Sequence, residues 1–308
     1  MVPGFCVEQD IEWLTDKRTG TQTGLLFIVG LVVLDIFCLI GMTTQPIGPL
    51  TFVLSLIILA SIPLLALIGY QLYGLARSGY GIDRNAVTIQ WGPIKQFVPV
   101  ESIQRIMLGT EVEGGVKYFR GWRWPGLMQG QGELPEADLT VFYASTSLPH
   151  QLILVTPSIS YAISPAVTAG FIESIKARYE LGPTQAIEQT TEHPAFFDWP
   201  VWSDRVAHYL LITGATMCLL LFGLVSLRFP HLPPLLPMHY NALGLPDRTG
   251  PALQVFMLPF IGLLALGANT FLGGVFYRRE QVASYLLWGG TIVVQVLLWI
   301  GTVNLLRV

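Results

Sequence analysis

A single carboxylate, Asp35, lies deep inside a long apolar segment of this 308-residue chain. A lone carboxylate is costly to bury in hydrocarbon, so it normally faces protein or water. Counted at about 1.5 Å per helical residue, Gln295 in another apolar segment lies at nearly the same depth and is the expected hydrogen-bond partner. Asp35 and Gln295 are therefore the candidate intramembrane polar pair, serving either to join helices or to support transport or channel-like gating.

A second candidate site alternates cations with indoles. Arg120, Trp122, Arg123 and Trp124 follow Lys117 within eight residues. Indoles favour the membrane interface, and arginines can reach lipid phosphates, so this cluster predicts binding to the lipid bilayer surface. The alternative is that the two tryptophans pack against their own domain.

A third candidate lies in a loop between two apolar segments. His231, His239 and Asp247 are of residue types that bind zinc, but a proline-rich stretch separates the two histidines and excludes a shared helix face. We expect no metal and no cofactor. Instead, Asn241 and Asp247 are expected to bond the backbone while Gly244 turns the chain, which makes a rigid external loop or a recognition surface.

Five apolar segments must position these residues. The chain is 52% hydrophobic and only 12% charged, and Asp35 is the one formal charge within the five segments. Each is long enough to span a bilayer as a helix. The predicted spans are 24–43, 50–76, 206–227, 252–275 and 283–306.

The basic residues beside the segment ends predict the orientation. Cytoplasmic flanks are enriched in Lys and Arg. One side carries seven such residues and the other carries three: Lys17, Arg18, Arg77, Arg84, Arg205, Arg278 and Arg279 against Arg228, Arg248 and Arg307. This places the N-terminus inside and the C-terminus outside.

A soluble domain rich in strands is predicted between the second and third spans. Residues 85–91 alternate apolar and polar side chains, and a Gly-Pro turn leads into a hairpin partner. About seven strands are expected, including 139–146, 151–156 and 159–164, whereas the Gly-rich stretch 125–138 is expected to be a flexible loop. A helix follows, with Ser164 as N-cap, Pro165 as first residue and an apolar stripe of Val167, Phe171, Ile175 and Tyr179.

These segments resemble the bacterial pleckstrin-homology-like (PH-like) domains of membrane proteins. The resemblance lies in YGIDRNAVTIQW (80–91), VPVESIQRI (98–106), RGWRWPG (120–126), YAST (143–146) and YAISP (161–165). It implies a bent β-barrel capped by one C-terminal helix. Phosphoinositide binding is not expected, because the first hairpin offers only Arg84 and Lys95.

A second resemblance lies in the external loop. The stretch LPPLLPMHYNALGLPDRTG at 232–250 is similar to a motif, P-x-H-x-N-x-x-G-x-P-D, of bacterial multi-span proteins of unknown function. The motif also occurs in immunity proteins that protect against a secreted killing peptide. The matching residues are Pro237, His239, Asn241, Gly244, Pro246 and Asp247.

The expected fold class is membrane α-helical, with five transmembrane helices and an inserted cytoplasmic PH-like β-barrel capped by one helix. The expected parts are a cytoplasmic segment (1–23), helices 1–2 (24–76), the PH-like domain (77–180), a linker with interfacial aromatics (181–205), and helices 3–5 (206–308) with an external loop (228–251).

The expected function is non-catalytic binding at the bacterial plasma (inner) membrane, because no nucleophile elbow, phosphate loop or H-E-x-x-H motif is present. The three cysteines show no C-x-x-C spacing, and a net charge of -3 disfavours nucleic acid. The protein is expected to bind a protein partner or the membrane, as an accessory subunit of a membrane complex or a sensor or immunity-type protein. The alternative is a transporter or channel-like protein that uses Asp35.

Overall fold

The computed structural model describes residues 13–185, 187–240 and 246–306. Within these residues, five helices are long and apolar enough to cross a membrane. They are α1 (Arg18–Thr44), α2 (Pro49–Ala76), α4 (Arg205–Arg228), α5 (Met257–Phe276) and α6 (Gln281–Leu305). The five predicted spans are thereby confirmed, although the start of the fourth forms the 3₁₀ helix η6 (Ala252–Phe256).

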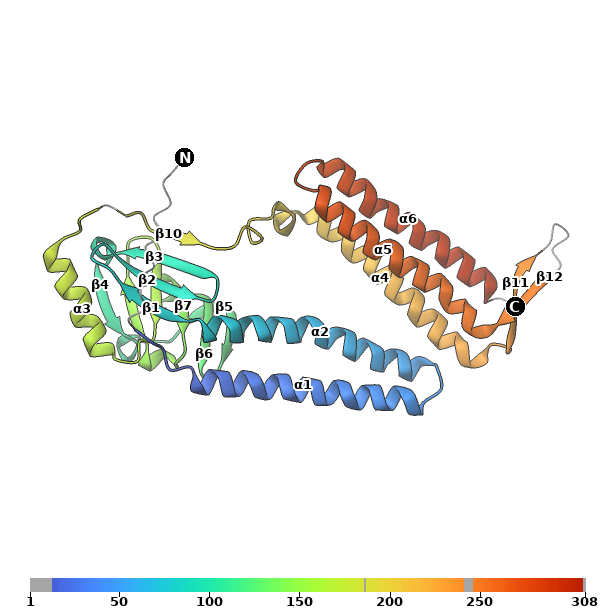
Figure 1. Cartoon of the computed structure of the whole chain (residues 1–308), viewed down its shortest axis with the longest axis horizontal. Helices are drawn as coiled ribbons and strands as arrows, with labels where there is room; N and C mark the ends of the chain where they lie inside the picture. The colour runs from blue at the N-terminus through green and yellow to red at the C-terminus, as the bar shows by residue number, and fades with distance from the viewer. Residues whose placement is uncertain (1–12, 186, 241–245, 307–308) are drawn as a thin grey trace. The chain divides into compact units, whose positions relative to one another are not determined.

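The chain forms two compact units. One contains Met1–Val32 and Ile62–Pro194, and the other contains Val33–Ser61 and Ala195–Val308. In the second unit, α4, α5 and α6 lie side by side (Figure 1). Short 3₁₀ helices join the longer elements: η1 (Val100–Ser102), η2 (Gly109–Glu111), η3 (Leu148–His150), η4 (Pro200–Ser203) and η5 (Phe229–His231).

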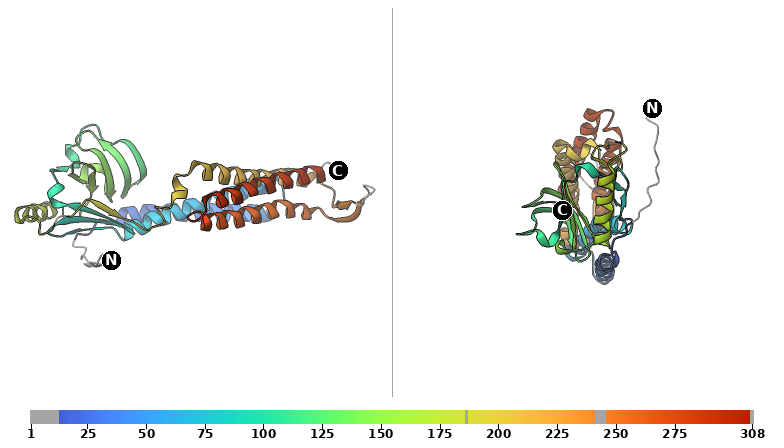
Figure 2. Two further views of the ribbon diagram at one scale, coloured as in Figure 1. Left: turned by 90° about the horizontal axis from the view of Figure 1, so that it is seen from above. Right: turned by 90° about the vertical axis from the view of Figure 1, so that its left-hand side faces the viewer.

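The domain between α2 and α4 consists of two sheets and the helix α3 (Thr168–Leu181), which lies at one end of the domain (Figure 2). The first sheet has the order β1 (Gly79–Ile82), β2 (Ala86–Trp91), β3 (Ile94–Pro99) and β10 (Thr190–Glu192). The second has the order β4 (Arg105–Leu108), β8 (Leu152–Val155), β9 (Ser160–Ile163), β7 (Asp138–Ala144), β6 (Leu127–Leu134) and β5 (Lys117–Trp124).

The expected barrel needs one correction: the two sheets are not closed into a barrel by a ladder of paired strands. Within the second sheet, β7 and β9 are parallel, and the other neighbouring strands are antiparallel. The predicted hairpin of β2 and β3 is confirmed, with Thr88 opposite Phe97.

The Gly-rich stretch 125–138, predicted as a flexible loop, is mostly strand. It contains β6, which lies between β5 and β7. Gly121 and Gly130 face each other across β5 and β6, and a Cβ on Gly121 would lie 2.2 Å from the carbonyl oxygen of Gln129. The glycines allow two backbones to approach closely, so their presence marks a tight strand pair rather than a loop.

The start of α3 also differs from the prediction. The helix begins at Thr168 after Val167, and Ser164 is not its N-cap. The Oγ of Ser164 instead accepts a hydrogen bond of 2.8 Å from the backbone N–H of Ser145. The hydroxyl of Ser164 therefore bonds the end of another strand, and it is not available to cap α3. Of the predicted stripe, only Phe171 and Ile175 are buried.

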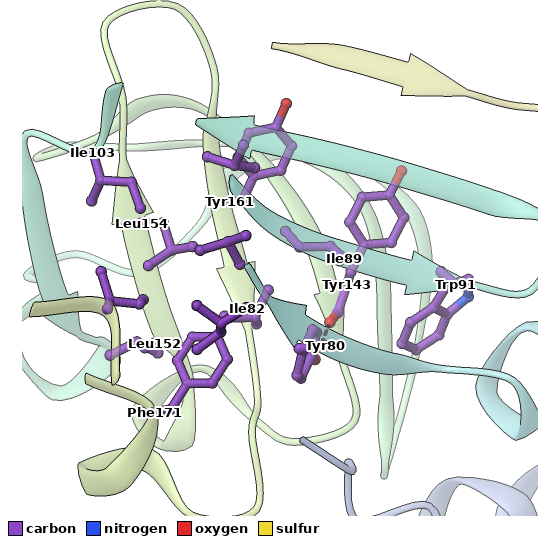
Figure 3. Close-up of a cluster of buried hydrophobic side chains, with 14 of the residues drawn as sticks. Tyr80, Ile82, Ile89, Trp91, Ile103, Tyr143, Leu152, Leu154, Tyr161 and Phe171 are labelled. Atoms are coloured by element: carbon purple, nitrogen blue, oxygen red, sulfur yellow. Dashed lines mark hydrogen bonds between the residues drawn. The ribbon is translucent and has the colours of Figure 1, made fainter. Parts of the chain in front are cut away.

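The domain core lies between the two sheets and α3 (Figure 3). Phe171 packs edge-on against Tyr80, with ring centroids 6.1 Å apart. The hydroxyl of Tyr80 donates to the carbonyl oxygen of Tyr143 at 2.7 Å and accepts from the backbone N–H of Ser164 at 2.9 Å. This buried tyrosine thereby joins the ends of strands from both sheets.

The loop between α4 and η6, predicted to be external, forms a two-stranded hairpin, β11 (Leu235–Tyr240) and β12 (Pro246–Pro251). Leu236 is buried with Val225 of α4 and Val255 of η6. Of the motif residues, His239 lies in β11 and Asp247 in β12, whereas Asn241 and Gly244 lie outside the described residues.

Candidate functional site

The turn between β5 and β6 contacts the first turns of α1. The indole N–H of Trp124 donates to the carbonyl oxygen of Gly20 at 3.2 Å, and its ring packs edge-on against Phe27 at 6.2 Å. Gly20 and Gly126 meet so closely that a Cβ on Gly20 would lie 2.0 Å from the Gly126 carbonyl oxygen. Because Phe27 belongs to the apolar part of α1, Trp124 lies where this helix enters the membrane.

The segments that flank the domain hold it to the adjoining ends of α1 and α2. Trp13 pairs with Tyr80 of β1 through two backbone hydrogen bonds of 3.0 and 2.9 Å. The hydroxyls of Thr15 and Ser78 share a hydrogen bond of 2.8 Å. Lys17 donates to the carbonyl oxygen of Ala76, the last residue of α2, at 2.8 Å, and burial lowers the pKa of this lysine. The domain is therefore fixed at its membrane attachment.

In the predicted cluster of cations and indoles, the tryptophans and the arginines have different environments. Trp122 and Trp124 are half-buried, lie 6.4 Å apart edge-to-face and pack against the domain core. Arg120 and Arg123 are exposed, and within the described part of the chain neither guanidinium has a hydrogen-bond or ion-pair partner. The tryptophans position the strand, and the arginines are available to a ligand.

Arg123 lines a cavity of about 490 Å³ beside the β5–β6 turn. Thr146 and Ser147, from the loop after β7, line the same cavity. The hydroxyl of Ser147 lies 3.3 Å from Nδ1 of His150. A guanidinium beside hydroxyl groups is suited to an anionic oxygen ligand such as a phosphate. Sequence reasoning missed Thr146 and Ser147, because their approach to Arg123 depends on the pairing of β6 with β7.

Asp35 and Gln295 are not each other's partners, contrary to the expectation. The Oγ of Ser61 in α2 donates to Asp35 at 2.7 Å. Gln295 donates to the carbonyl oxygen of Gly262 in α5 at 3.0 Å. The expectation rested on equal depth along two helices, but the face that each helix turns to its neighbour decides the partner. Asp35 thus joins α1 to α2, and Gln295 joins α6 to α5.

A second polar cluster, missed from the sequence, lies at one end of α4, α5 and α6. Oδ2 of Asp204 accepts hydrogen bonds from the hydroxyls of Tyr277, at 2.5 Å, and Tyr285. Oδ1 accepts from the backbone N–H of Val206 at 2.8 Å, which caps α4. These bonds, that of Tyr277 first, hold the pKa of Asp204 well below its usual range. The aspartate before an apolar run signalled the cap, but not the two tyrosines.

We expect Asp204→Asn to remove an acid-sensitive part of the stability of this helical unit. Since the pKa of Asp204 is lowered in the folded protein, its contribution is complete above the ordinary Asp pKa of about 4 and decreases as the pH falls toward the lowered value. The melting temperature of the full-length protein in detergent should therefore fall more steeply below about pH 4 in the wild type than in Asp204→Asn.

The exposed carboxylate of Glu280, just before α6, provides the control. Glu280→Gln should retain the wild-type pH profile. Parallel profiles for the wild type and Asp204→Asn would contradict the assigned role of Asp204.

Comparison with known families defines the class of protein. Residues 78–179 match the family described as Bacterial PH domain. Residues 216–263 match the family described as Domain of unknown function (DUF1648), a segment that contains the hairpin motif of 237–247. No curated protein and no solved structure matches the chain.

Both resemblances inferred from the sequence are thereby confirmed. The chain is a multi-pass membrane protein, and its described residues contain five membrane helices with a PH-like domain between the second and third of them. Neither matched family is a known enzyme family.

Proposed function

We propose that this protein is a non-catalytic binding protein of the bacterial plasma membrane, whose PH-like domain engages anionic lipid headgroups on the cytoplasmic surface. The N-terminus is cytoplasmic and the C-terminus external. It acts as an accessory subunit of a membrane complex, or as a sensor or immunity-type protein that presents the β11–β12 hairpin outside.

The observation that carries this proposal is the contact between the β5–β6 turn and α1. Trp124 bonds Gly20 and packs on Phe27, so the neighbouring Arg123 lies at the depth of the lipid phosphates. Tryptophan is typical of this interfacial depth. The Arg123 guanidinium, which has no partner among the described residues, and the adjoining cavity supply the positive charge and the space that a headgroup needs.

The distribution of basic residues supports placing the PH-like domain on the cytoplasmic side of the membrane. Basic residues gather at the ends of the apolar segments on the side of the PH-like domain. The cytoplasmic leaflet is rich in anionic lipids, which attract exposed arginines by about 1 kcal/mol each.

Arg123→Gln tests this function. The variant should bind anionic phospholipid about fivefold more weakly, as expected for the loss of about 1 kcal/mol of surface attraction. Native mass spectrometry of the full-length protein in neutral detergent, titrated with phosphatidylglycerol, would measure the bound fraction. Binding of zwitterionic phosphatidylcholine should be nearly unchanged.

Lys176, an exposed cation on α3 that does not line the cavity, provides the matched control. Lys176→Gln should bind phosphatidylglycerol like the wild type. Equal losses in both variants would indicate a diffuse charge effect, and no loss in Arg123→Gln would refute the headgroup site.

A further inference from the structure

The linker that follows α3 crosses the PH-like domain through polar contacts. Oδ1 of Asn85 accepts hydrogen bonds from the backbone N–H groups of Thr184 and Gln185 at 2.8 and 3.2 Å. Farther along, Nε2 of Gln189 donates to the hydroxyl of Tyr161 at 2.9 Å. The linker therefore follows a defined path over the domain before it continues to α4.

The linker ends on the domain as an added strand. β10 pairs antiparallel with β3, with Thr191 opposite Gln96 and Glu192 opposite Lys95. The hydroxyl of Thr191 donates to Oε1 of Gln96 at 2.7 Å. β10 thereby occupies the edge of β3, whose backbone groups would otherwise be open to another strand.

This strand is held weakly compared with the rest of the sheet. All three residues of β10 are exposed, and no described residue in 183–194 is buried. By contrast, five of the six residues of β2 are buried. A segment with exposed hydrogen bonds and no buried apolar side chain opens locally at low free-energy cost. β10 should therefore leave β3 while the domain stays folded.

Opening would uncover polar groups beneath the linker. Gln96 is only 7% exposed and lies with its Nε2 3.3 Å from the hydroxyl of Tyr143. Figure 3 shows that the hydroxyls of Tyr143 and Tyr161 point toward the side of the domain where β3 and β10 run. These groups would provide hydrogen bonds to an incoming segment in addition to the edge of β3.

We propose that the edge of β3 is a docking site for an extended segment of a partner protein, and that β10 is its resident occupant. The partner segment runs antiparallel to β3, with a hydroxyl side chain opposite Gln96 and a carboxylate opposite Lys95, as Thr191 and Glu192 do now. Strand addition of this kind obtains affinity from main-chain hydrogen bonds and specificity from alternate side chains.

The length of the strands favours a partner protein over a second copy of this chain. β3 has six residues, but β10 pairs with only three of them. A longer partner strand gains hydrogen bonds that β10 does not make. The linker of a second copy is already bound to its own domain through Asn85 and Tyr161, so it would have to leave that domain before it could bind here. This surface is distinct from the Arg123 cavity and does not depend on the function proposed there.

Thr191→Pro opens the site for a direct test. Proline removes the hydroxyl and a backbone N–H, so β10 should leave the edge of β3. The probe is a fluorescent peptide copying residues 188–193, which in the register of β10 would lie opposite all six residues of β3. If the edge is open in a tenth of wild-type molecules or fewer, the peptide should bind the full-length variant about tenfold more tightly or better.

Two controls define the specificity. Glu188→Pro introduces proline in the same linker outside β10 and should retain wild-type affinity for the peptide. A peptide with valine at the position of Thr191 should bind the opened variant about fivefold more weakly, because it lacks one hydrogen bond. Failure of the parent peptide to bind Thr191→Pro would overturn the proposal, and dimerisation of that variant without peptide would overturn the choice of a partner protein.

Hydrogen exchange of the wild-type protein keeps the proposal testable if the proline variant does not fold. Amides of 190–192 and 95–97 should exchange together, well before those of β2. Protection of β10 equal to that of β2 would show a permanent strand and would also overturn the proposal.

Discussion

Phe171→Ala should lower the free energy of unfolding of the PH-like domain by about 3–5 kcal/mol, the usual cost of emptying a large aromatic site. Phe171 is fully buried and packs edge-on against Trp13, with ring centroids 5.6 Å apart, as well as against Tyr80. Its removal therefore loosens α3 and the segment before α1 at once. Hydrogen exchange of the β2 amides in the full-length protein would measure the loss.

Val167 provides the control on the same predicted stripe. Its side chain is 59% exposed, so Val167→Ala should change the stability by no more than about 0.5 kcal/mol. Equal effects of the two substitutions would contradict the packing of α3 against the domain core through Phe171. Faster exchange at residues 13–15 in Phe171→Ala alone would confirm the link to Trp13.

Tyr80→Phe should cost about 2–6 kcal/mol although it deletes only one oxygen atom. The hydroxyl of Tyr80 satisfies the carbonyl oxygen of Tyr143 and the backbone N–H of Ser164. Each buried group left without a partner costs about 1–3 kcal/mol. The same hydrogen-exchange measurement applies, and Tyr118→Phe, at a side chain 79% exposed, should have no measurable effect.

Alkaline pH gives a second measurement on Tyr80. Burial raises the pKa of this phenol to about 12. Because the pKa is raised in the folded state, the contribution of Tyr80 is complete below its ordinary pKa of about 10 and is lost as the pH rises toward the raised value. Tyr80→Phe should lack this part of the alkaline destabilisation. Identical alkaline profiles would contradict the hydrogen-bonding role.

The two proposed surfaces of the PH-like domain differ in chemistry and in their tests. The Arg123 cavity is suited to an anionic headgroup and should respond to charge. The β3 edge is suited to an extended peptide and should respond to backbone blocking. A negative result in the lipid-binding test would therefore leave the peptide-docking proposal intact, and the reverse also holds.

Charge exclusion by itself determined the membrane plan of this protein. A helix in lipid must bury a continuous apolar length, so composition along the chain reveals each span without knowledge of its neighbours. Alternating residues likewise determined β2 and its hairpin with β3, because period two and a Gly-Pro turn are local signals. The class of the inserted domain was predicted from its resemblance to a known family, which the family match confirms.

Only the tertiary structure decided which distant groups meet. β6 and β10 have weak local strand signals and exist because neighbouring strands pair with them. Ser164 bonds Ser145 instead of capping α3, and Asp35 bonds Ser61 instead of Gln295. Residue type predicted that these polar groups need partners. The partner itself depends on strand register and helix rotation, which are set by the packing of whole elements and not by any local stretch of sequence.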